Sequence, residues 1–274
     1  MPGDAADTEV GQVARALNTM LGRIESAFAE RNATEARLRQ FVADASHELR
    51  TPLAAVAAYA EMFDRGASVR PDDLARVMTG IRAETDRMGQ LVEDLLLLAR
   101  LDEGQPLEHR PVEVVALAAK AIETATTVGP DWPIRLHADQ PVEVVGDPAR
   151  LRQVVDNLLA NIRAHTPPGT TALMRVSANA NEAVVEVSDN GPGLTDEQVS
   201  RVFERFYRAD PSRSRQRGGA GLGLGIVAAI VAAHGGRVAA SSGPAGGAVF
   251  TVRLPLAEAG EGVETNGLHP PEGP

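Results

Sequence analysis

Two stretches within the first hundred residues carry apolar side chains at seven-residue spacing, the pattern of helices that pack along a narrow seam. The first series is Val10, Leu17 and Ile24, interleaved with Ala14, Leu21 and Phe28, and it resumes as Val42, Leu49, Val56 and Phe63, interleaved with Leu38, Ala45, Pro52 and Tyr59. We expect an interruption at Arg31, Asn32 and Ala33. A helix of roughly 30 residues should then follow and end near Arg65 and Gly66.

A second helix is predicted after the turn that contains Gly66 and Pro71. Its seam is Leu74, Ile81, Met88 and Leu95, interleaved with Val77, Leu91 and Leu98. Within a single hairpin, two helices of this length leave part of their apolar seams exposed to solvent. We therefore expect two copies of the hairpin to bury these seams against each other in a dimeric antiparallel four-helix bundle. The alternative is an unrelated two-helix stalk inside a monomer.

From Gly104 onward, short β-like runs alternate with helical ones, and Gln105, Pro106 and Pro111 mark a linker. The predicted strands are 112–114, 134–137, 142–145, 173–178, 183–188, 237–241 and 248–254, and the predicted helices are 115–126, 148–165 and 222–234. Because a glycine-rich turn joins the last two strands, a two-layer α/β domain with hairpin pairs is expected. The tail beyond Leu256 has the composition of a disordered segment.

Composition excludes several classes of function. The chain has no cysteine, hence no disulfide framework or thiolate nucleophile, and its net charge of −10 opposes a nucleic-acid partner. An arginine cluster is the local exception, with Arg201, Arg205, Arg208, Arg213, Arg215 and Arg217. No apolar run approaches the ~20 residues needed to cross a bilayer. We therefore expect the chain as given to be soluble.

His47 is the first candidate for chemistry. With Val42 and Leu49 on the seam, His47 points to solvent, Glu48 flanks it, and Thr51 lies one turn further on. An imidazole beside a carboxylate can act as a nucleophile with a base, although a single exposed histidine is ordinarily a surface residue. Pro52, in the middle of the helix, predicts a bend close to this histidine.

The second domain contains three further signals. Asn157 and Asn161, four residues apart, share one helix face, and amide oxygens are suitable ligands for Mg²⁺. Asp189 ends a strand before a glycine turn and can accept a hydrogen bond from the exocyclic amine of adenine. The run 218–225 has five glycines and opens an apolar helix, where backbone N–H groups can approach an anion. Taken singly, these are also typical of polar surface, a plain turn and a linker.

Together the motifs resemble those of sensor histidine kinases. The string Ser46-His47-Glu48-Leu49-Arg50-Thr51-Pro52 resembles their phosphoacceptor box. The asparagine pair, the turn 189–193, the segment 203–208 and the glycine run follow in the order of the N, G1, F and G2 boxes. The resemblance covers about residues 34 to 255 and implies a Bergerat-type ATPase domain that binds ATP and Mg²⁺ beneath a mobile lid.

The resemblance also assigns roles to single residues. It makes His47 the phosphoryl acceptor, Glu48 its base, and Thr51 the residue that orients water in a phosphatase reaction. For the nucleotide it implies that Asn157 and Asn161 hold Mg²⁺ and the phosphates, with Asn161 as the metal ligand, that Asp189 binds the adenine, and that Arg208 and the glycines bind the phosphoryl charge. The full ATP-binding set is Asn157, Asn161, Asp189, Gly191, Gly193, Arg208, Gly219, Gly221, Leu222 and Gly223. The implied partners are a response-regulator receiver domain and a second copy of the chain.

Four segments follow from this interpretation. Residues 1–32 resemble the second helix of a HAMP relay module, 33–103 the phosphotransfer hairpin, 104–256 the ATP-binding domain, and 257–274 form the tail. A plain coiled-coil extension is the alternative for 1–32. The HAMP likeness implies either the cytoplasmic part of a membrane sensor, whose anchor would lie outside this sequence, or a product that begins at an internal Met.

One departure from the family pattern keeps a second function open. Ala164 stands where the family usually has lysine, and His165 where it usually has an aromatic residue. The lost lysine removes a phosphate contact, which Arg163 or an arginine of the lid could replace. A non-catalytic nucleotide-binding adaptor is therefore the alternative. An ATPase of the chaperone or topoisomerase kind is disfavoured by the histidine hairpin upstream.

Overall fold

The computed structural model describes residues 9–65, 70–208, 220–243 and 246–256. The chain divides into two compact units, Met1–Met88 and Gly89–Pro274. The boundary falls inside a helix, whereas the sequence places it in the linker near Gly104; the division at residues 103 and 104 stays a prediction. Among the described residues, no helix combines the length and the apolar character that crossing a membrane requires.

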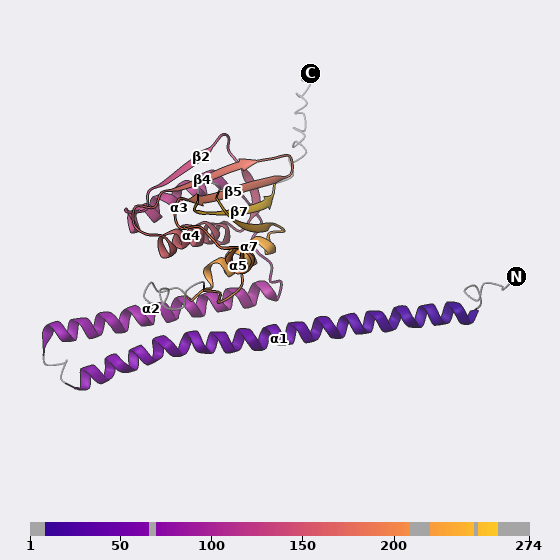
Figure 1. The fold of residues 1–274 in the computed structure, drawn as a ribbon, viewed down its shortest axis with the longest axis horizontal. Coiled ribbons are helices and arrows are strands. Elements are labelled where there is room, and N and C mark those ends of the chain that lie inside the picture. The colour runs from indigo at the N-terminus through magenta and orange to yellow at the C-terminus, as the bar shows by residue number, and fades with distance from the viewer. Residues whose placement is uncertain (1–8, 66–69, 209–219, 244–245, 257–274) are drawn as a thin grey trace, which may run out of the picture. The chain divides into compact units, whose positions relative to one another are not determined.

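Helix α1 (Glu9–Asp64) is continuous over 56 residues (Figure 1). The predicted interruption at Arg31, Asn32 and Ala33 is therefore wrong. None of these three residues is a glycine or proline, so a gap in the apolar pattern did not amount to a break in the backbone. The helix also continues past Pro52, which removes a single backbone hydrogen bond.

The first unit is a hairpin of α1 and the first half of α2 (Pro71–Asp102). Tyr59 on α1 packs directly onto α2, where a Cβ atom at Gly80 would overlap its ring. Val77 is buried beside this contact, with 1% of its surface exposed. Several apolar residues that the heptad pattern places on the seam are instead uncovered in one chain: Leu17, Leu21, Ile24, Phe28, Leu38 and Val42.

The second unit is a two-layer α/β domain that follows the end of α2. Its strands are β1 (Arg110–Glu113), β2 (Ile134–Ala138), β3 (Glu143–Gly146), β4 (Ala172–Ala178), β5 (Glu182–Asp189), β6 (Arg237–Ser242) and β7 (Ala248–Pro255). Its helices are α3 (Val114–Val128), α4 (Pro148–His165), α5 (Asp196–Arg201) and α7 (Gly223–Ala233). All seven predicted strands and all three predicted helices are confirmed, with ends that move by one or two residues.

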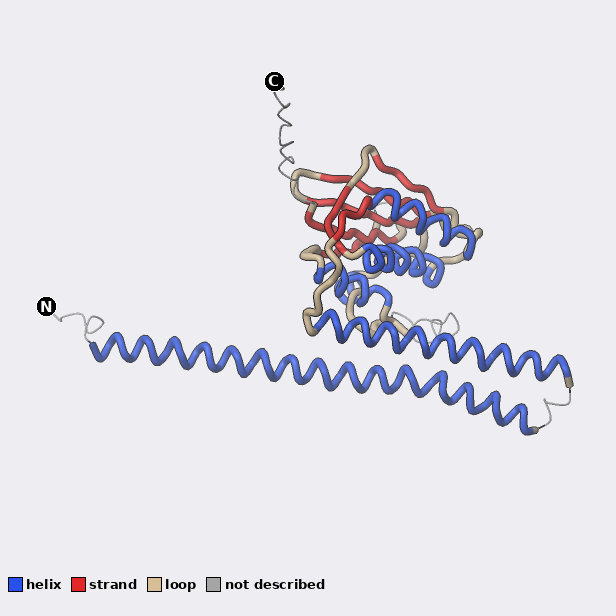
Figure 2. The backbone as a smooth tube through the Cα atoms, turned by 180° about the vertical axis from the view of Figure 1, so that it is seen from behind, coloured by secondary structure: helices blue, strands red, loops and turns tan. Residues whose placement is uncertain are grey.

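The main sheet has five strands in the order β2-β4-β5-β7-β6. Only β2 and β4 run parallel in it, and the other neighbours are antiparallel. Strands β1 and β3 form a separate two-stranded ribbon. Helices α3, α4 and α7 pack against one another in turn and make the second layer (Figure 2). This arrangement confirms the fold class predicted from the sequence.

Alternation of apolar residues along the strands gives the sheet its buried face. Met174, Val185 and Phe250 from neighbouring strands are each exposed by 3% or less, and they meet fully buried Leu158 and Ile226 of the helical layer. Side chains also define the helix starts. Asp147 accepts hydrogen bonds from the amides of the first turn of α4, and Pro148 occupies the first helical position.

Candidate functional site

His47 lies on α1 with its side chain exposed, as the seam pattern predicts, and Glu48 beside it is half-buried. The hydroxyl of Thr51 lies 3.5 Å from the carbonyl oxygen of His47, so the two side chains share one helix face. Pro52 is buried and cannot donate the usual helical bond to the carbonyl of Glu48. His47, Glu48 and Thr51, which are predicted to act together, therefore occupy two adjacent helical turns that directly precede Pro52.

Helix α4 presents the asparagine pair because its neighbouring face is fixed in the core. Leu158 and Ile162 are fully buried, and Asn157 and Asn161, each about 100° away around the helix, are half-buried at the edge of that buried face. The side-chain Nδ2 of Asn157 donates a hydrogen bond to the carbonyl oxygen of Gly223, at 3.2 Å, and so joins α4 to the start of α7. Among the described residues, the amide of Asn161 has no protein partner, which leaves it available to a ligand.

Asp189 at the end of β5 is held in one orientation by the backbone. Its Oδ1 atom accepts hydrogen bonds from the amides of Gly191 (2.8 Å) and Ala248 (3.3 Å). Its Oδ2 atom accepts none from the described residues and can receive a ligand amine. Gly247 has a φ of +81°, and a Cβ atom there would overlap the carbonyl of Asp189, so this close approach requires glycine.

The glycine run is packed, unlike a flexible linker, over the part that the structure describes. Gly221 has a φ of +73°, and a Cβ atom on it would lie 2.9 Å from both the carbonyl carbon of Phe206 and the carbonyl oxygen of Tyr207. Leu222 is buried and precedes α7, which has no side-chain cap at its first turn. The first amides of α7, from Gly223 on, are thus available to an anion.

Two predicted features lie wholly or partly beyond the described residues. Gly219 falls in the segment 209–219, as do Arg213, Arg215 and Arg217. Arg208 is described and half-buried. Arg163, offered as a substitute for the missing lysine, lies two residues and hence about 200° around the helix from Asn161. Its stem packs near Gly129, so this substitution is not supported by the geometry.

The structure adds an ion pair that the sequence did not predict. The guanidinium of Arg205 forms two hydrogen bonds with the carboxylate of Asp102, the last residue of α2. The neighbouring Phe206 has a φ of +61°, a strained value for a residue with a side chain. Helix α5 was also missed, although Thr195 and Gln198 form the capping box that marks its start.

Burial produces one notable shift in acidity. Desolvation of the half-buried carboxyl of Asp94, together with the neighbouring charge of Glu93, raises the pKa of Asp94 to about 6. Asp94 lies on α2 and belongs to none of the motifs. It is therefore a stability determinant that the sequence did not signal.

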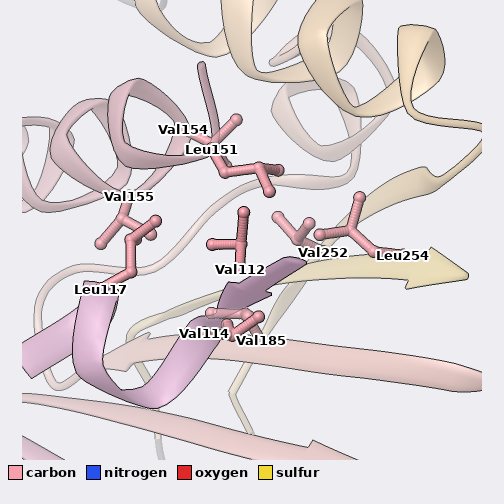
Figure 3. A pocket seen from close by; sticks show the side chains of 9 residues that line it. All are labelled: Val112, Val114, Leu117, Leu151, Val154, Val155, Val185, Val252 and Leu254. Carbon is pink, nitrogen blue, oxygen red and sulfur yellow. The ribbon is translucent and has the colours of Figure 1, made fainter. Parts of the chain in front are cut away.

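An apolar cavity lies in the core of the second unit and is not the nucleotide site. It is lined by apolar side chains of β1, α3, α4, β5 and β7, including Val112, Leu151 and Val185, and holds only about 20 Å³ (Figure 3). None of the predicted nucleotide residues lines it. A space of this size with apolar walls is a packing gap in the core.

Comparison with known proteins places both parts of this arrangement in one class. Residues 37–104 match the "His Kinase A (phospho-acceptor) domain", and residues 146–258 match the "Histidine kinase-, DNA gyrase B-, and HSP90-like ATPase". The first match contains His47 and the second contains Asn157, Asn161 and Asp189. A phosphoacceptor hairpin followed by an ATPase domain defines a protein-histidine kinase architecture.

Relatives of the whole chain identify the family. The chain is 52% identical to the probable sensor histidine kinase TcrY of Mycobacterium tuberculosis over 93% of its length, and 35% identical to the kinase BaeS of Escherichia coli over 92%. It spans 54% and 52% of those two proteins. The ShkA structure in complex with AMPPNP matches 81% of this chain and 46% of its own, with a TM-score of 0.61 and 28% identity. The chain belongs to the sensor histidine kinase family.

Proposed function

We propose that the protein is an ATP-dependent histidine kinase that phosphorylates its own His47 and passes the phosphoryl group to an aspartate of a response-regulator receiver domain. The observation that carries this proposal is the exposed imidazole of His47 beside Glu48, within a matched phosphoacceptor domain. The ATPase domain supplies the phosphoryl donor. The chain spans about half the length of relatives such as TcrY. Autophosphorylation and phosphoryl transfer are therefore proposed for this part alone.

Recognition of ATP rests on the groups that the fold leaves available. The Oδ2 atom of Asp189 would accept the exocyclic amine of adenine, because Oδ1 is already used by two backbone amides. The amides at the start of α7, together with Arg208, would hold the phosphates. The base and the phosphates thus have separate, fixed contacts.

Mg²⁺ fits the same site through Asn161. The amide oxygen of Asn161 is a hard ligand with no protein partner among the described residues. Those residues also contain no cluster of three or more histidine, cysteine or acidic side chains able to hold a metal. Asn161 would hold the ion beside the nucleotide phosphates, since Mg²⁺ is usually held by one or two protein oxygen ligands together with substrate phosphates. When bound, it supplies neutralisation of phosphate charge.

Phosphoryl transfer requires His47 to be neutral at the attacking nitrogen. The lone pair of one ring nitrogen forms a bond to the γ-phosphorus while the bond from that phosphorus to the bridging oxygen breaks, and ADP leaves with the electron pair. Glu48 accepts the proton of the other ring nitrogen, which balances the charge that develops on the imidazole. The protein contributes positioning and electrostatics to the transfer.

The same helix face also supports a phosphatase activity toward the phosphorylated receiver domain. Thr51 lies one turn beyond His47, where its hydroxyl would orient a water molecule for hydrolysis of the phosphorylated receiver. Uncovered apolar side chains of the hairpin, such as Leu38 and Val42, support pairing with a second copy into a four-helix bundle. Residues 1–32 would be the relay helix of a HAMP module on the cytoplasmic side of a membrane anchor. No contact with nucleic acid is proposed.

Incubation with γ-labelled Mg·ATP tests the proposal. The wild type should become labelled, and His47→Gln should lose all label while it binds ATP with unchanged affinity by calorimetry. Glutamine keeps the size and polarity of the side chain but removes the nucleophile. Wild-type protein that binds ATP without becoming labelled would instead favour the adaptor function that the alanine at position 164 suggests.

A further inference from the structure

The sole tryptophan of the chain is hydrogen-bonded to a buried threonine at the end of α4. The indole Nε1 of Trp132 donates to the hydroxyl of Thr166 at 3.0 Å, and that hydroxyl donates to the carbonyl of Ile162 at 2.8 Å. Thr166 is 4% exposed. Its hydroxyl therefore accepts one hydrogen bond and donates another, and the two partners fix its orientation.

The methyl group of Thr166 lies against the adenine-side turn. A Cβ atom at Gly191 would be 2.7 Å from Cγ2 of Thr166 and 2.9 Å from Oδ1 of Asp189. The amide of Gly191 is also the donor that holds Asp189, at 2.8 Å. Thr166 consequently packs against the peptide that orients the carboxylate.

Further hydrogen bonds connect the same three segments. The amide of Gly169 donates to the carbonyl of Asp131 at 2.8 Å, which ties the loop after α4 to the loop that carries Trp132. The amide of Thr171 donates to the side chain of Asn190 at 2.8 Å, and the amide of Asn190 donates back to the carbonyl of Thr171 at 3.2 Å. A continuous set of contacts thus runs from Trp132 to the end of β5.

Thr166 stands between the two halves of the nucleotide site. Its hydroxyl is bonded to the residue that directly follows Asn161, and its methyl group contacts the turn after Asp189. A rigid link at this point sets the separation between the group proposed for Mg²⁺ and the phosphates and the group proposed for adenine. Misplacement of either half costs binding even when all direct contacts remain.

We infer that Thr166, oriented by Trp132, is a positioning residue for ATP that fixes Asp189 relative to Asn161. This inference rests on the proposed function, because it assumes that ATP occupies this site. It concerns affinity more than the transfer step, since neither residue reaches the reacting phosphorus or His47.

Three variants of the full chain separate positioning from general stability. Thr166→Val keeps the shape but removes the hydroxyl, so that the indole N–H of Trp132 loses its acceptor. Thr166→Ser restores the hydroxyl. Thr170→Val is the matched control, because Thr170 is 5% exposed and its hydroxyl bonds only to Pro167 within its own loop.

The readouts are the Kd for Mg·ATP by calorimetry and the ATP dependence of His47 phosphorylation. We expect Thr166→Val to raise Kd and KM about 10-fold, the loss typical of one buried hydrogen bond, and to change the maximal rate less than about 2-fold. Thr170→Val should stay within about 3-fold of the wild type. Thr166→Ser restores the hydroxyl but lacks the methyl group that lies against Gly191, so its Kd should fall between those of the wild type and Thr166→Val. Trp132→Phe, which removes the donor and leaves Thr166 intact, should raise Kd about 3-fold.

The outcomes distinguish the inference from the function on which it rests. Wild-type protein that fails to bind Mg·ATP overturns both. If the wild type binds but Thr166→Val binds equally well, or Thr170→Val is weakened as much, only the positioning role is overturned. Should Thr166→Val fail to fold, unchanged ATP affinity in Trp132→Phe overturns it instead.

Discussion

Arg205 and Asp102 form a bidentate ion pair that joins two distant parts of the chain. The Nη1 and Nη2 atoms of Arg205 lie 2.7 and 2.6 Å from the two carboxylate oxygens of Asp102. Asp102 ends α2, whereas Arg205 packs against Gly225 near the start of α7. The end of the phosphotransfer hairpin is thereby tied to a segment that borders the proposed phosphate site.

Loss of this ion pair should loosen both segments more than it lowers overall stability. Because the two side chains are 32% and 55% exposed, Asp102→Asn should cost less than about 1 kcal/mol of unfolding free energy. Amide hydrogen exchange should rise at the end of α2 and in residues 203–208. Glu103→Gln, a neighbouring change outside the pair, is the control and should leave exchange in 203–208 unchanged. If amide exchange in residues 203–208 were the same in both variants, the ion pair would not hold this segment to the end of α2.

Asp189→Asn should abolish most ATP binding without disturbing the turn. An asparagine can keep Oδ1 as the acceptor for Gly191 and Ala248, but it places an NH₂ donor where adenine also presents a donor. We expect Kd for Mg·ATP to rise at least about 30-fold, which corresponds to the cost of opposing two donors. Calorimetry measures this. Asp196→Asn, at an exposed acid of α5, should bind like the wild type, and equal loss in both variants would refute the assignment.

Gly221→Ala should destabilise the segment that precedes α7. Its φ of +73° disfavours any side chain, and the new Cβ atom would lie 2.9 Å from the backbone at Phe206 and Tyr207. We expect a loss of about 1–3 kcal/mol in chemical denaturation, with weaker ATP binding. In contrast, Gly89→Ala on α2 meets open space and should stabilise the protein by about 0.5–1 kcal/mol. If Gly221→Ala left the free energy of unfolding unchanged, the close packing at Gly221 would be absent.

The raised pKa of Asp94 predicts a specific pH dependence. The folded state holds this proton up to about pH 6, whereas an unfolded aspartate releases it near 3.8. Stability is therefore lost as the pH rises through this window, and the penalty persists above it. Asp94→Asn should be more stable than the wild type by about 2 kcal/mol at pH 7.5 and by nothing below pH 3.5, because both side chains are then neutral. Urea denaturation at the two pH values measures the difference.

Asp86→Asn provides the control for that experiment, since Asp86 is an exposed residue of the same helix. It should change stability little at either pH. A stabilisation of Asp94→Asn that did not depend on pH would mean that the charge is not the cause.

The parts of the molecule that follow local periodicity were predictable, and those that depend on distant contacts were not. The strand alternation around Met174 and Val185 and the seam around His47 gave the correct elements, because each side chain pattern reflects one buried face. The gap at Arg31 was misread, since an interrupted seam says nothing of backbone continuity. Thr166 and Trp132 are 34 residues apart and Arg205 and Asp102 are 103 apart, so no local pattern could pair them.

Site residues divide in the same way. Motif order makes Asn157, Asn161 and Asp189 candidate ligand-binding residues, and the structure places them on the expected elements, α4 and the end of β5. Their relative positions depend on the loop after α4 and on the hairpin that contains Gly247, which are set by tertiary packing. Sequence reasoning therefore names the candidate ligand-binding residues, whereas the structure shows which neighbouring residues hold them in place.

Mapping of the phosphoryl group tests the central claim most directly. The full chain would be incubated with Mg·ATP, digested at neutral pH to preserve phosphohistidine, and analysed by mass spectrometry. The account predicts a single modified peptide that contains His47, with the modification lost on brief acid treatment and absent from Asp189→Asn. A phosphoryl group on another residue, or an unmodified His47 in protein that binds ATP, would contradict it.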